Sequence, residues 1–484
     1  MPSYRTEKDS LGEKRVPADA YYGIFTQRAK ENFPLSGTRV HPRMIWALAV
    51  IKEAAAEANK ELEMLDARTA DAIVRASKEV QKGKFNDAFV IDVFQAGAGT
   101  PTNMNANEVI ANRATQMLGG KIGTYIVHPN NHVNMGQSTN NVFPSAMRIA
   151  VFSTINDLIT QLKMLESSLR KKAKQFRDVI KVGRTHLQDA VPLLLGQEFE
   201  AYADYVKRGY VRMRNLSDEL LELGVGGTAI GTQVNAHPHF RKTCVSHIAK
   251  ITGEKFYSTE SPVYLTQSVD SFVQASAVLR AYATDALKIA NDLILMTSGP
   301  KAGLHEIELP EVEPGSSIMP GKINPSIVEA YKMVCLQALG NDHAIEHASR
   351  EGQLELNPMT PVIAHNLLSS VDLLTNGTKM FRERCVDGIR ANREACERTF
   401  ANSLSVATAL TPYIGYEVTA YLVKEALKKG FSIREVVLEH GLMTEGELTR
   451  ILNPYRMTHA TVVDRELKTR ILKSDAFRKL SRKV

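Results

Sequence analysis

The chain has 484 residues, of which 44% are hydrophobic and 23% charged, and this balance is that of an ordinary soluble globular protein. One hydrophobic core rarely serves so long a chain, so we expect two or three domains. The formal charge is +7, and residues 468–483 supply +6 of it, with seven cations against one anion. The remainder is nearly neutral, so we interpret the basic tail as a solvated end and take nucleic-acid binding through it as the weaker alternative.

Four cysteines, Cys244, Cys335, Cys385 and Cys396, form no C-x-x-C pair, which argues against a zinc site or a disulfide framework. The polar N-terminus lacks the apolar core of a signal peptide. No apolar run approaches the roughly 18 residues that a membrane helix needs. We therefore expect a cytoplasmic protein with reduced thiols and no membrane partner.

In chain order, residues 1–140 mix turns with two expected helices, near 41–64 and 68–82. The next segment has an apolar stripe with steps of three or four residues, which is typical of a long bundle helix. The stripe consists of Met147, Val151, Ile155, Leu158, Leu162, Leu165 and Leu169. Four more long helices are expected at about 196–223, at 265–296, from Pro325 through 339, and at 362–374. Helices this apolar predict burial by partner subunits, and hence a homo-oligomer.

After about residue 396 the expected helices become shorter. Ser432 with Glu435, and Thr444 with Glu447, both fit the S/T-x-x-E capping box that opens a helix. We therefore predict a mainly α protein with three domains. These are a mixed N-terminal domain at 1–140, a central domain at 141–395 with a long five-helix bundle, and a small C-terminal helical domain at 396–484.

The segment 315–325, GSSIMPGKINP, places two hydroxyls, a cation and an amide in one short stretch. Its glycines and prolines exclude a regular helix or strand. Five residues separate Gly315 from Gly321, and Ile323 follows Lys322, so the spacing of a phosphate-binding P-loop is not met. Taken alone, the segment is either a surface loop with a helix cap or a loop that holds a carboxylate and moves a proton.

Three other polar clusters, at 97–105, 137–141 and 183–189, each precede an expected helix. A helix N-terminus offers free N–H groups and a positive dipole end to an anion, although Ser, Thr, Asn and Asp are also ordinary caps. Because these clusters and the 315–325 loop stand at the ends of long helices, we favour one shared pocket. His186 shows no metal-binding spacing, so we expect no metal, and a structural role competes with a catalytic one.

Residues 224–229, GVGGTA, formally match the dinucleotide-binding fingerprint G-x-G-x-x-G/A. That motif requires a preceding strand, whereas residues 211–223 have a helical pattern. We therefore expect a helix stop followed by a loop, and no cofactor.

Together, the three clusters and the 315–325 loop resemble the fumarase/aspartase superfamily, whose signature G-S-S-x-M-P-x-K-x-N is met in full at 315–324. The likeness extends over nearly the whole chain, to about residue 457. HVNM at 132–135, QSTN at 137–140 and EGQLELN at 351–357 resemble the aspartase branch. The resemblance implies a homotetramer whose active sites are shared between subunits. It also implies a C4 dicarboxylate substrate, with reversible deamination of L-aspartate to fumarate and ammonia.

The same resemblance implies roles for individual side chains. Ser316 would be the general base, and Glu329 would partner His186. The remaining residues would bind substrate, with Lys322 and Asn324 on the α-carboxylate, Thr100, Ser138, Thr139 and Ser317 on the β-carboxylate, Asn140 and His186 at the amino group, and Thr185 beside them. Removing a C3 proton builds charge on the neighbouring carboxylate, and preorganised donors around it are usually the largest catalytic contribution.

Four residues depart from the usual family pattern. Asn141 stands where relatives usually carry Asp, Gln233 replaces a common Gly, Pro358 replaces a common Val, and Pro101 follows the Gly-Thr turn. Asn141 removes a charge next to the expected amine contact. The alternatives that therefore stay open are a fumarate hydratase or a lyase for a related amino acid, and a catalytically silent relative kept as a structural or binding protein.

Overall fold

The computed structural model describes residues 3–484, which divide into two compact units. Unit 1 comprises residues 3–162, Arg208–Asp285 and Met333–Gly377. Unit 2 comprises Lys163–Lys207, Ala286–Lys332 and Thr378–Val484. The predicted division into three domains, at residues 140 and 395, follows different boundaries and stays a prediction.

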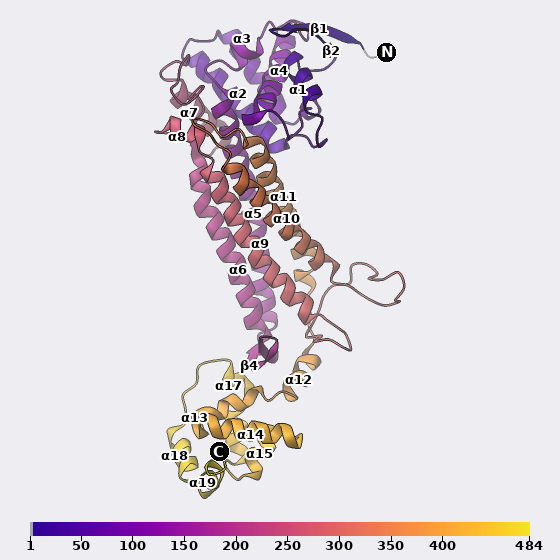
Figure 1. Cartoon of the computed structure of the whole chain (residues 1–484), viewed down its shortest axis with the longest axis vertical. Helices are drawn as coiled ribbons and strands as arrows, with labels where there is room; N and C mark the ends of the chain where they lie inside the picture. Colours follow the sequence, from indigo (N-terminus) through magenta and orange to yellow (C-terminus); the bar gives the residue numbers. More distant parts are fainter. Residues whose placement is uncertain (1–2) are drawn as a thin grey trace. The chain divides into compact units, whose positions relative to one another are not determined.

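Five long helices contribute residues to both units (Figure 1). They are α5 (Thr139–Gln175), α6 (Leu195–Ser217), α9 (Asp270–Met296), α10 (Ser326–Ser349) and α11 (Thr360–Arg384). All seven residues of the predicted apolar stripe are buried on α5, as its steps of three and four residues require. The predicted mainly α fold with five long helices is confirmed.

The remaining elements of unit 1 are short strands and medium-length helices. They are β1 (Tyr4–Asp9), β2 (Gly12–Pro17), α1 (Ile24–Asn32), α2 (Pro42–Glu61), α3 (Ala67–Gln81), η1 (Asn86–Ala88), η2 (Gly97–Gly99), α4 (Thr100–Met117), η3 (Pro129–Val133), η4 (Asp218–Leu221), β5 (Glu222–Leu223), α7 (Phe240–Thr252), β6 (Tyr257–Ser258) and α8 (Pro262–Gln267). Helices α2 and α3 confirm the two helices expected near 41–64 and 68–82.

The remaining elements of unit 2 are short strands and a group of short helices. They are β3 (Ile180–Thr185), β4 (Gln188–Leu194), β7 (Ile307–Glu308), η5 (Val386–Gly388), β8 (Arg390–Ala391), α12 (Arg393–Ala401), η6 (Ser405–Leu410), α13 (Thr411–Ile414), α14 (Tyr416–Lys429), α15 (Ile433–Glu439), α16 (Glu445–Ile451), α17 (Pro454–Met457), α18 (Arg465–Lys473) and α19 (Asp475–Ser481). Both predicted capping boxes are present, at the starts of α15 and α16.

Three predicted boundaries are wrong. The cluster at 183–189 does not precede a helix but forms the tip of the antiparallel β3–β4 hairpin, because residues 180–194 pair as strands. Helix α6 ends at Ser217 rather than near 223, and β5 precedes Gly224, where a helix was expected. The expected helix at 265–296 is divided into α8 and α9, since Ser268 after α8 takes an extended conformation.

Polar contacts join the long helices within each unit. In unit 2, Arg170 on α5 donates to Asp204 on α6 at 2.6 Å, and Tyr202 on α6 donates to Asp292 on α9 at 2.8 Å. In unit 1, Asn341 on α10 donates to Ser370 on α11 at 3.0 Å. These pairs lie alongside the buried apolar residues and favour one lateral arrangement of the helices, since a displaced helix would leave them unpaired.

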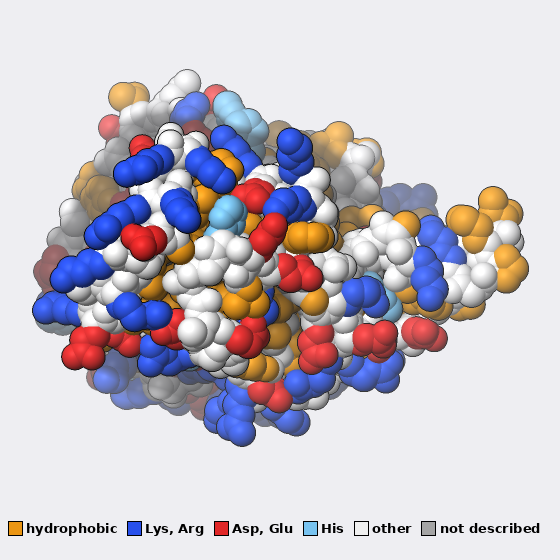
Figure 2. Space-filling model, turned by 90° about the horizontal axis from the view of Figure 1, so that it is seen from below, with side chains coloured by type: hydrophobic (Ala, Val, Ile, Leu, Met, Phe, Trp, Pro, Cys, Tyr) orange, Lys and Arg blue, Asp and Glu red, His pale blue; other side chains and the backbone are white. Residues whose placement is uncertain are grey.

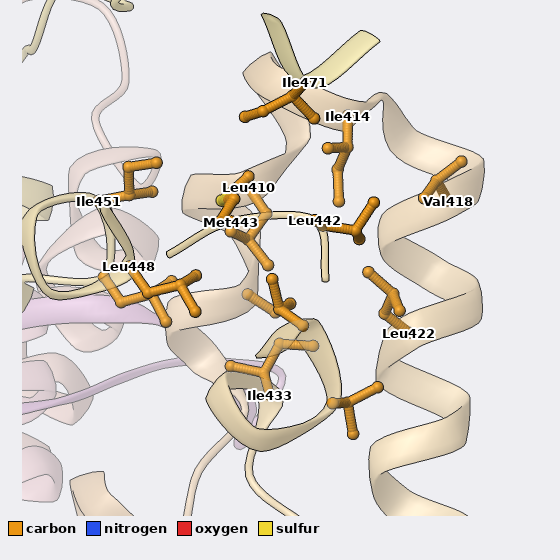
Figure 3. Packing of buried hydrophobic residues seen from close by; sticks show 14 of the residues in the cluster. Leu410, Ile414, Val418, Leu422, Ile433, Leu442, Met443, Leu448, Ile451 and Ile471 are labelled. Carbon is orange, nitrogen blue, oxygen red and sulfur yellow. The ribbon is translucent and has the colours of Figure 1, made fainter. Parts of the chain in front are cut away.

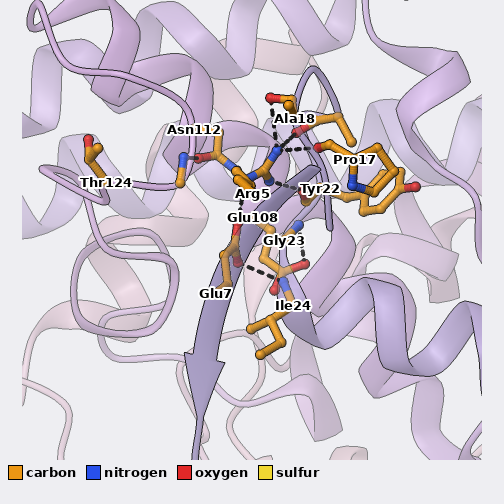
Figure 4. A network of polar contacts seen from close by, with 12 residues as sticks. Arg5, Glu7, Pro17, Ala18, Tyr22, Gly23, Ile24, Glu108, Asn112 and Thr124 are labelled. Atoms are coloured by element: carbon orange, nitrogen blue, oxygen red, sulfur yellow. Dashed lines mark hydrogen bonds and ion pairs between the residues drawn. The ribbon is translucent and has the colours of Figure 1, made fainter. Parts of the chain in front are cut away.

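A buried carboxylate network fixes the start of α1 in unit 1 (Figure 4). Glu108 on α4 accepts from the backbone N–H groups of Gly23 at 2.8 Å and Phe25 at 2.9 Å, and Glu7 accepts from Ile24 N–H at 2.8 Å. Burial raises the pKa of Glu108 to about 7. The backbone donors favour the ionised form and therefore oppose this shift. Arg5 donates to Glu7 at 2.7 Å and so balances its charge.

The C-terminal helices of unit 2 enclose a separate apolar cluster (Figure 3). Leu410, Leu422, Val436 and Leu448 come from four different helical elements and are fully buried. Burying a side chain of this size contributes roughly 1.5–3 kcal/mol. The basic segment at 468–483 belongs to α18 and α19, which close this cluster with Ile471 and Leu480 while their cations stay exposed.

The four cysteines are all buried and free. Within residues 3–484, no helix combines the length and the apolar character needed to cross a membrane.

Candidate active site

The loop at 315–325 is closed by its own backbone. The N–H of Gly315 donates to the carbonyl oxygen of Lys322 at 2.8 Å, and the N–H of Lys322 donates to the carbonyl oxygen of Met319 at 3.3 Å. A Cβ atom at position 315 would lie 2.5 Å from the Lys322 oxygen, so only glycine allows this approach. The loop therefore has a defined shape although most of its side chains are exposed.

Ser316 lies at the first turn of this loop, and its hydroxyl oxygen is an acceptor. The backbone N–H groups of Ile318 and Met319 donate to Ser316 Oγ at 3.2 and 3.0 Å. Two N–H groups directed at one oxygen lower the energy of its deprotonated form more than that of the hydroxyl, since donors favour the charged state. This arrangement suits a serine that takes a proton.

The other polar side chains of the loop differ in what they contact. The Lys322 side chain is exposed and makes no hydrogen bond or ion pair within residues 3–484, so its charge is available to a ligand. The Asn324 amide nitrogen donates to the Gly315 carbonyl oxygen at 2.7 Å, which helps close the loop and leaves the amide oxygen uncommitted. Ser317 is exposed beside Ser316.

Thr185 and His186 stand at the tip of the β3–β4 hairpin, on the surface of unit 2. The two central residues of the turn, His186 and Leu187, have φ angles of 54° and 57°. Two left-handed residues form the turn that matches strand twist in a tight hairpin, and glycine or asparagine usually fills it. Holding His and Leu there costs roughly 1–2 kcal/mol per residue, so the hairpin stores strain where a candidate functional side chain stands.

A buried group of charges anchors this hairpin. Lys181 on β3 lies 3.0 Å from Glu306 and 2.9 Å from Glu198, and Arg184 lies 2.7 Å from Glu306. Burial alone would lower the pKa of Lys181, but the two carboxylates raise it above its usual value. Glu306 directly precedes β7 on the chain segment that leads to the 315–325 loop, so the group connects the hairpin to that segment.

In unit 1, Thr100 begins α4 after an unusually tight turn. Ala98 and Gly99 have φ angles of 62° and 78°, and a Cβ at position 99 would lie 2.2 Å from the ring of Phe143 on α5. The turn is therefore pressed against the first turns of α5. Pro358 accepts a hydrogen bond from Ala98 N–H at 2.9 Å.

Two of the departures from the family pattern are accommodated by this turn. Pro101 occupies the first turn of α4, where its missing N–H is not needed. Pro358 contributes its carbonyl oxygen to the turn, and any residue can supply that group. Neither change removes a contact of the site.

Ser138, Thr139 and Asn140 form the N-terminus of α5. The hydroxyl of Thr139 accepts from the Asn103 amide nitrogen at 2.9 Å, and Ser138 Oγ accepts from the Asn140 N–H at 3.3 Å. The Asn140 side chain donates to the carbonyl oxygen of Ala229 at 2.8 Å. The structure thus brings these predicted residues together with α4, which Thr100 opens.

A buried lysine lies behind this helix start. Lys52 Nζ on α2 donates to Asn134 Oδ1 at 3.0 Å and to Gln137 Oε1 at 2.9 Å. Burial lowers the pKa of Lys52 to about 7. Asn134 also accepts from the Asn103 amide at 3.3 Å, so three hydrogen bonds in series connect the lysine to Thr139.

Asn141 does not face the candidate site. It is 2% exposed, and its amide nitrogen donates to the carbonyl oxygen of Thr228 at 2.7 Å. An aspartate at this position would place a buried carboxylate beside the Thr228 carbonyl oxygen, which would repel it. Gln233, in the loop that follows, has a φ angle of 63°, which explains why glycine suits that position better.

The predicted site residues thus form two sets. Thr100, Ser138, Thr139 and Asn140 belong to unit 1, whereas Thr185, His186, Ser316, Ser317, Lys322, Asn324 and Glu329 belong to unit 2. Glu329 is exposed on α10, and no hydrogen bond or ion pair joins it to His186 within residues 3–484 of one chain.

Several contacts of the candidate site were not predicted from the sequence. The backbone donors to Ser316 depend on loop geometry and leave no signal in residue identity. Lys52 stands among mainly apolar residues of a helix, so its position carried no signal of a polar contact. Asn103 and Asn107 had a usable signal, since their spacing of four residues places both on one face of α4.

The sequence matches the family described as Lyase over residues 12–340 and the family described as Fumarase C C-terminus over residues 406–459. It is 49% identical to an aspartate ammonia-lyase from Bacillus sp, over 96% of this chain and 99% of that protein. It is also 49% identical to a class II fumarate hydratase from Halobacterium salinarum, over 95% of this chain and 98% of that protein.

Solved structures of the same type superpose closely. A fumarate lyase:delta crystallin from Brucella melitensis, bound to cobalt, gives a TM-score of 0.92 at 46% identity, over 95% of this chain and all of that one. A recombinant class II fumarase from Schistosoma mansoni also gives 0.92, at 36% identity, over 94% and 99%. The fold and these matches define a helical lyase. The chain belongs to the fumarase/aspartase superfamily.

Proposed function

We propose that this enzyme is a carbon–nitrogen lyase that converts L-aspartate reversibly to fumarate and ammonia. The observation that carries the proposal is the pair of backbone N–H groups directed at Ser316 Oγ. Deprotonated Ser316 takes the C3 proton of the substrate, and the electrons of the C–H bond move into the carboxylate attached to C3. That carboxylate then carries two negative charges.

The second half of the reaction returns those electrons. They form the C2–C3 double bond while the C2–N bond breaks, and ammonia leaves with the electron pair of that bond. The charge on the intermediate needs donors that are already in place, and one well-placed donor contributes roughly 3–4 kcal/mol. We assign this role to the hydroxyls of Thr100, Ser138, Thr139 and Ser317, and the binding of the other carboxylate to Lys322 and Asn324.

We also propose a homotetramer whose active sites are shared between subunits, as the family resemblance implies. Exposed apolar side chains on α10 support burial against partner subunits. Met333 and Leu336 on α10 are 68% and 55% exposed, and their spacing of three residues places them on one helix face. Pairing of Glu329 with His186 is then a contact between subunits. We expect the enzyme to act in the cytoplasm.

A fumarate hydratase is the second candidate, because the Halobacterium salinarum enzyme is as similar as the Bacillus sp one. Both reactions share the proton removal at C3 and differ in the group that leaves C2. Asn140 favours the aminated substrate in our assignment, since its side-chain oxygen can accept from an ammonium group.

Supplying fumarate with and without ammonium separates these functions. The proposal predicts that aspartate forms when ammonium is present and that malate does not form without it, as identified by nuclear magnetic resonance. Malate formation alone would establish the hydratase. No conversion by a folded protein in either condition would favour the catalytically silent relative.

A further inference from the structure

A pocket of about 390 Å³ lies among the C-terminal elements of unit 2. Its walls come from β4, η6, α13, α16 and α17 and from residues 459–464. Pockets for drug-sized molecules typically measure about 300–1,000 Å³. None of the residues that we assign to the active site lines this pocket.

The cations of the pocket are only partly neutralised. Arg450 is paired with Asp464 at 2.8 Å, and Asp464 also caps α18 by accepting from Leu467 N–H at 3.0 Å. The Leu467 N–H, with Arg450 beside it, holds the pKa of Asp464 below its usual value. The side chains of Arg456 and His459 have no partner within residues 3–484. An unpaired guanidinium and an imidazole that line the same pocket are suited to an oxyanion.

The rest of the lining is mostly apolar. Pro412, Ile451 and Met457 contribute hydrocarbon surface, and Ile451 is 8% exposed. The hydroxyl oxygen of Tyr413 accepts from the Asp464 N–H at 3.3 Å, which leaves its own O–H free to donate. A ligand for this pocket therefore needs an anionic group and an apolar body.

The surroundings are electropositive. Exposed cations of α18 and α19, among them Lys468, Lys473 and Lys479, lie in the same C-terminal group of helices. Figure 2 shows lysine and arginine side chains, with aspartate and glutamate side chains among them, over the face that looks downward in Figure 1. A field of this sign raises the local concentration of anions and speeds their association.

We propose that this pocket binds an organic anion, with a phosphate or carboxylate group held by Arg456 and His459 and an apolar body covering Ile451 and Met457. The bound molecule also stabilises the β3–β4 hairpin, because Val191 of β4 forms one wall. Two further hydrogen bonds join residues 455–458, at the pocket, to the residues that flank the β3–β4 hairpin. Tyr455 donates to the Asp178 carbonyl oxygen, and Gln197 donates to the Thr458 carbonyl oxygen, both at 3.1 Å.

Calorimetric titration of the whole protein tests the site with four probes, phenyl phosphate, phenylacetate, inorganic phosphate and succinate. We expect one of the two aromatic anions to bind at least tenfold more tightly than inorganic phosphate, whereas succinate, as a C4 dicarboxylate, reports on the candidate active site. The stronger of the two identifies the preferred anionic group. Arg456→Ala should weaken that binding by about tenfold or more, since a charge-assisted hydrogen bond is lost.

Matched variants make the result specific. Arg478→Ala on α19 removes the same charge outside the pocket, and Lys322→Ala removes the cation of the candidate active site. Both should bind the aromatic anion as the unmodified protein does. Absence of binding to the unmodified protein, equal binding by Arg456→Ala, or equal loss in either control would overturn the proposal.

Hydrogen exchange tests the proposed stabilisation of the β3–β4 hairpin. Bound probe should slow exchange of the β4 amides, and unchanged exchange would refute the proposed stabilisation.

Discussion

The backbone N–H of Met319 donates a hydrogen bond to Ser316 Oγ at 3.0 Å. Serine is a poor base in water, because its hydroxyl loses a proton only at high pH. A loop that directs this N–H and that of Ile318 at the same oxygen stabilises the alkoxide before substrate arrives. The loop is thus the structural feature on which the proposed chemistry depends.

Lys322→Ala tests carboxylate binding by the same loop. The lysine is exposed and unpaired, so the substitution should leave folding unchanged. Losing a charge-assisted hydrogen bond should lower kcat/KM for L-aspartate by about 10–100-fold. Steady-state kinetics measure this, with Lys301→Ala as a control that removes an exposed lysine outside the loop. A normal kcat/KM in Lys322→Ala would show that this lysine does not bind the substrate.

Glu306→Ala tests the anchor of the hairpin. The carboxylate is fully buried between Lys181 and Arg184, so its removal leaves two cations without this partner. Breaking a buried pair in this way typically costs about 3–5 kcal/mol. Urea unfolding should show this loss, whereas Glu308→Ala, at an exposed pair with Arg390, should cost under about 1 kcal/mol. Equal effects would mean that the buried group is not an anchor.

Lys52→Met tests the buried lysine through pH. Burial lowers the pKa of Lys52 from 10.5 to about 7, so between those values the unfolded chain binds a proton that the folded chain lacks. The stability of the unmodified protein should therefore rise with pH above 7, relative to Lys52→Met, by at most about 1.4 kcal/mol per pH unit.

Below pH 7 the lysine is protonated in both states, so the difference between the two proteins should be constant. Denaturant unfolding at a series of pH values provides the comparison. A difference that does not change from pH 7 to 9 would show that Lys52 keeps its ordinary pKa in the folded protein.

Gln233→Gly tests backbone strain. Gln233 has a φ angle of 63°, and the left-handed conformation costs roughly 1–2 kcal/mol for a residue with a side chain. Glycine removes that cost but adds about 0.5–1 kcal/mol of unfolded-state entropy. The free energy of unfolding should rise by up to about 1 kcal/mol, whereas Gln233→Ala should show no gain. A lower free energy of unfolding in Gln233→Gly would show that Gln233 is not strained in the folded protein.

The bundle was predictable because its signal is periodic. The stripe from Met147 to Leu169 recurs with the helical period, so its burial on α5 followed from spacing alone. The hairpin at 180–194 was not predictable in the same way. His186 and Leu187 occupy left-handed turn positions without glycine or asparagine, so the usual sign of a tight hairpin is absent.

The candidate site was predictable in its residue types but not in its contacts. The signature at 315–324 identified Ser316 and Lys322 through resemblance, whereas the donors to Ser316 are main-chain groups that every sequence possesses. The missing charge at Asn141 was expected to affect the amine contact because Asn141 follows Asn140. The Asn141 side chain is instead buried, and its amide nitrogen donates to the Thr228 carbonyl oxygen.

The most direct measurement is the release of fumarate and ammonia from L-aspartate by the unmodified protein and by Ser316→Ala. The hydroxyl is a minor structural contact in a largely exposed loop, so the variant should keep its helical circular dichroism and its oligomeric state. If Ser316 is the base, the unmodified protein releases both products and the variant loses activity by about 10²-fold or more. Release at a near-normal rate by Ser316→Ala would contradict the account.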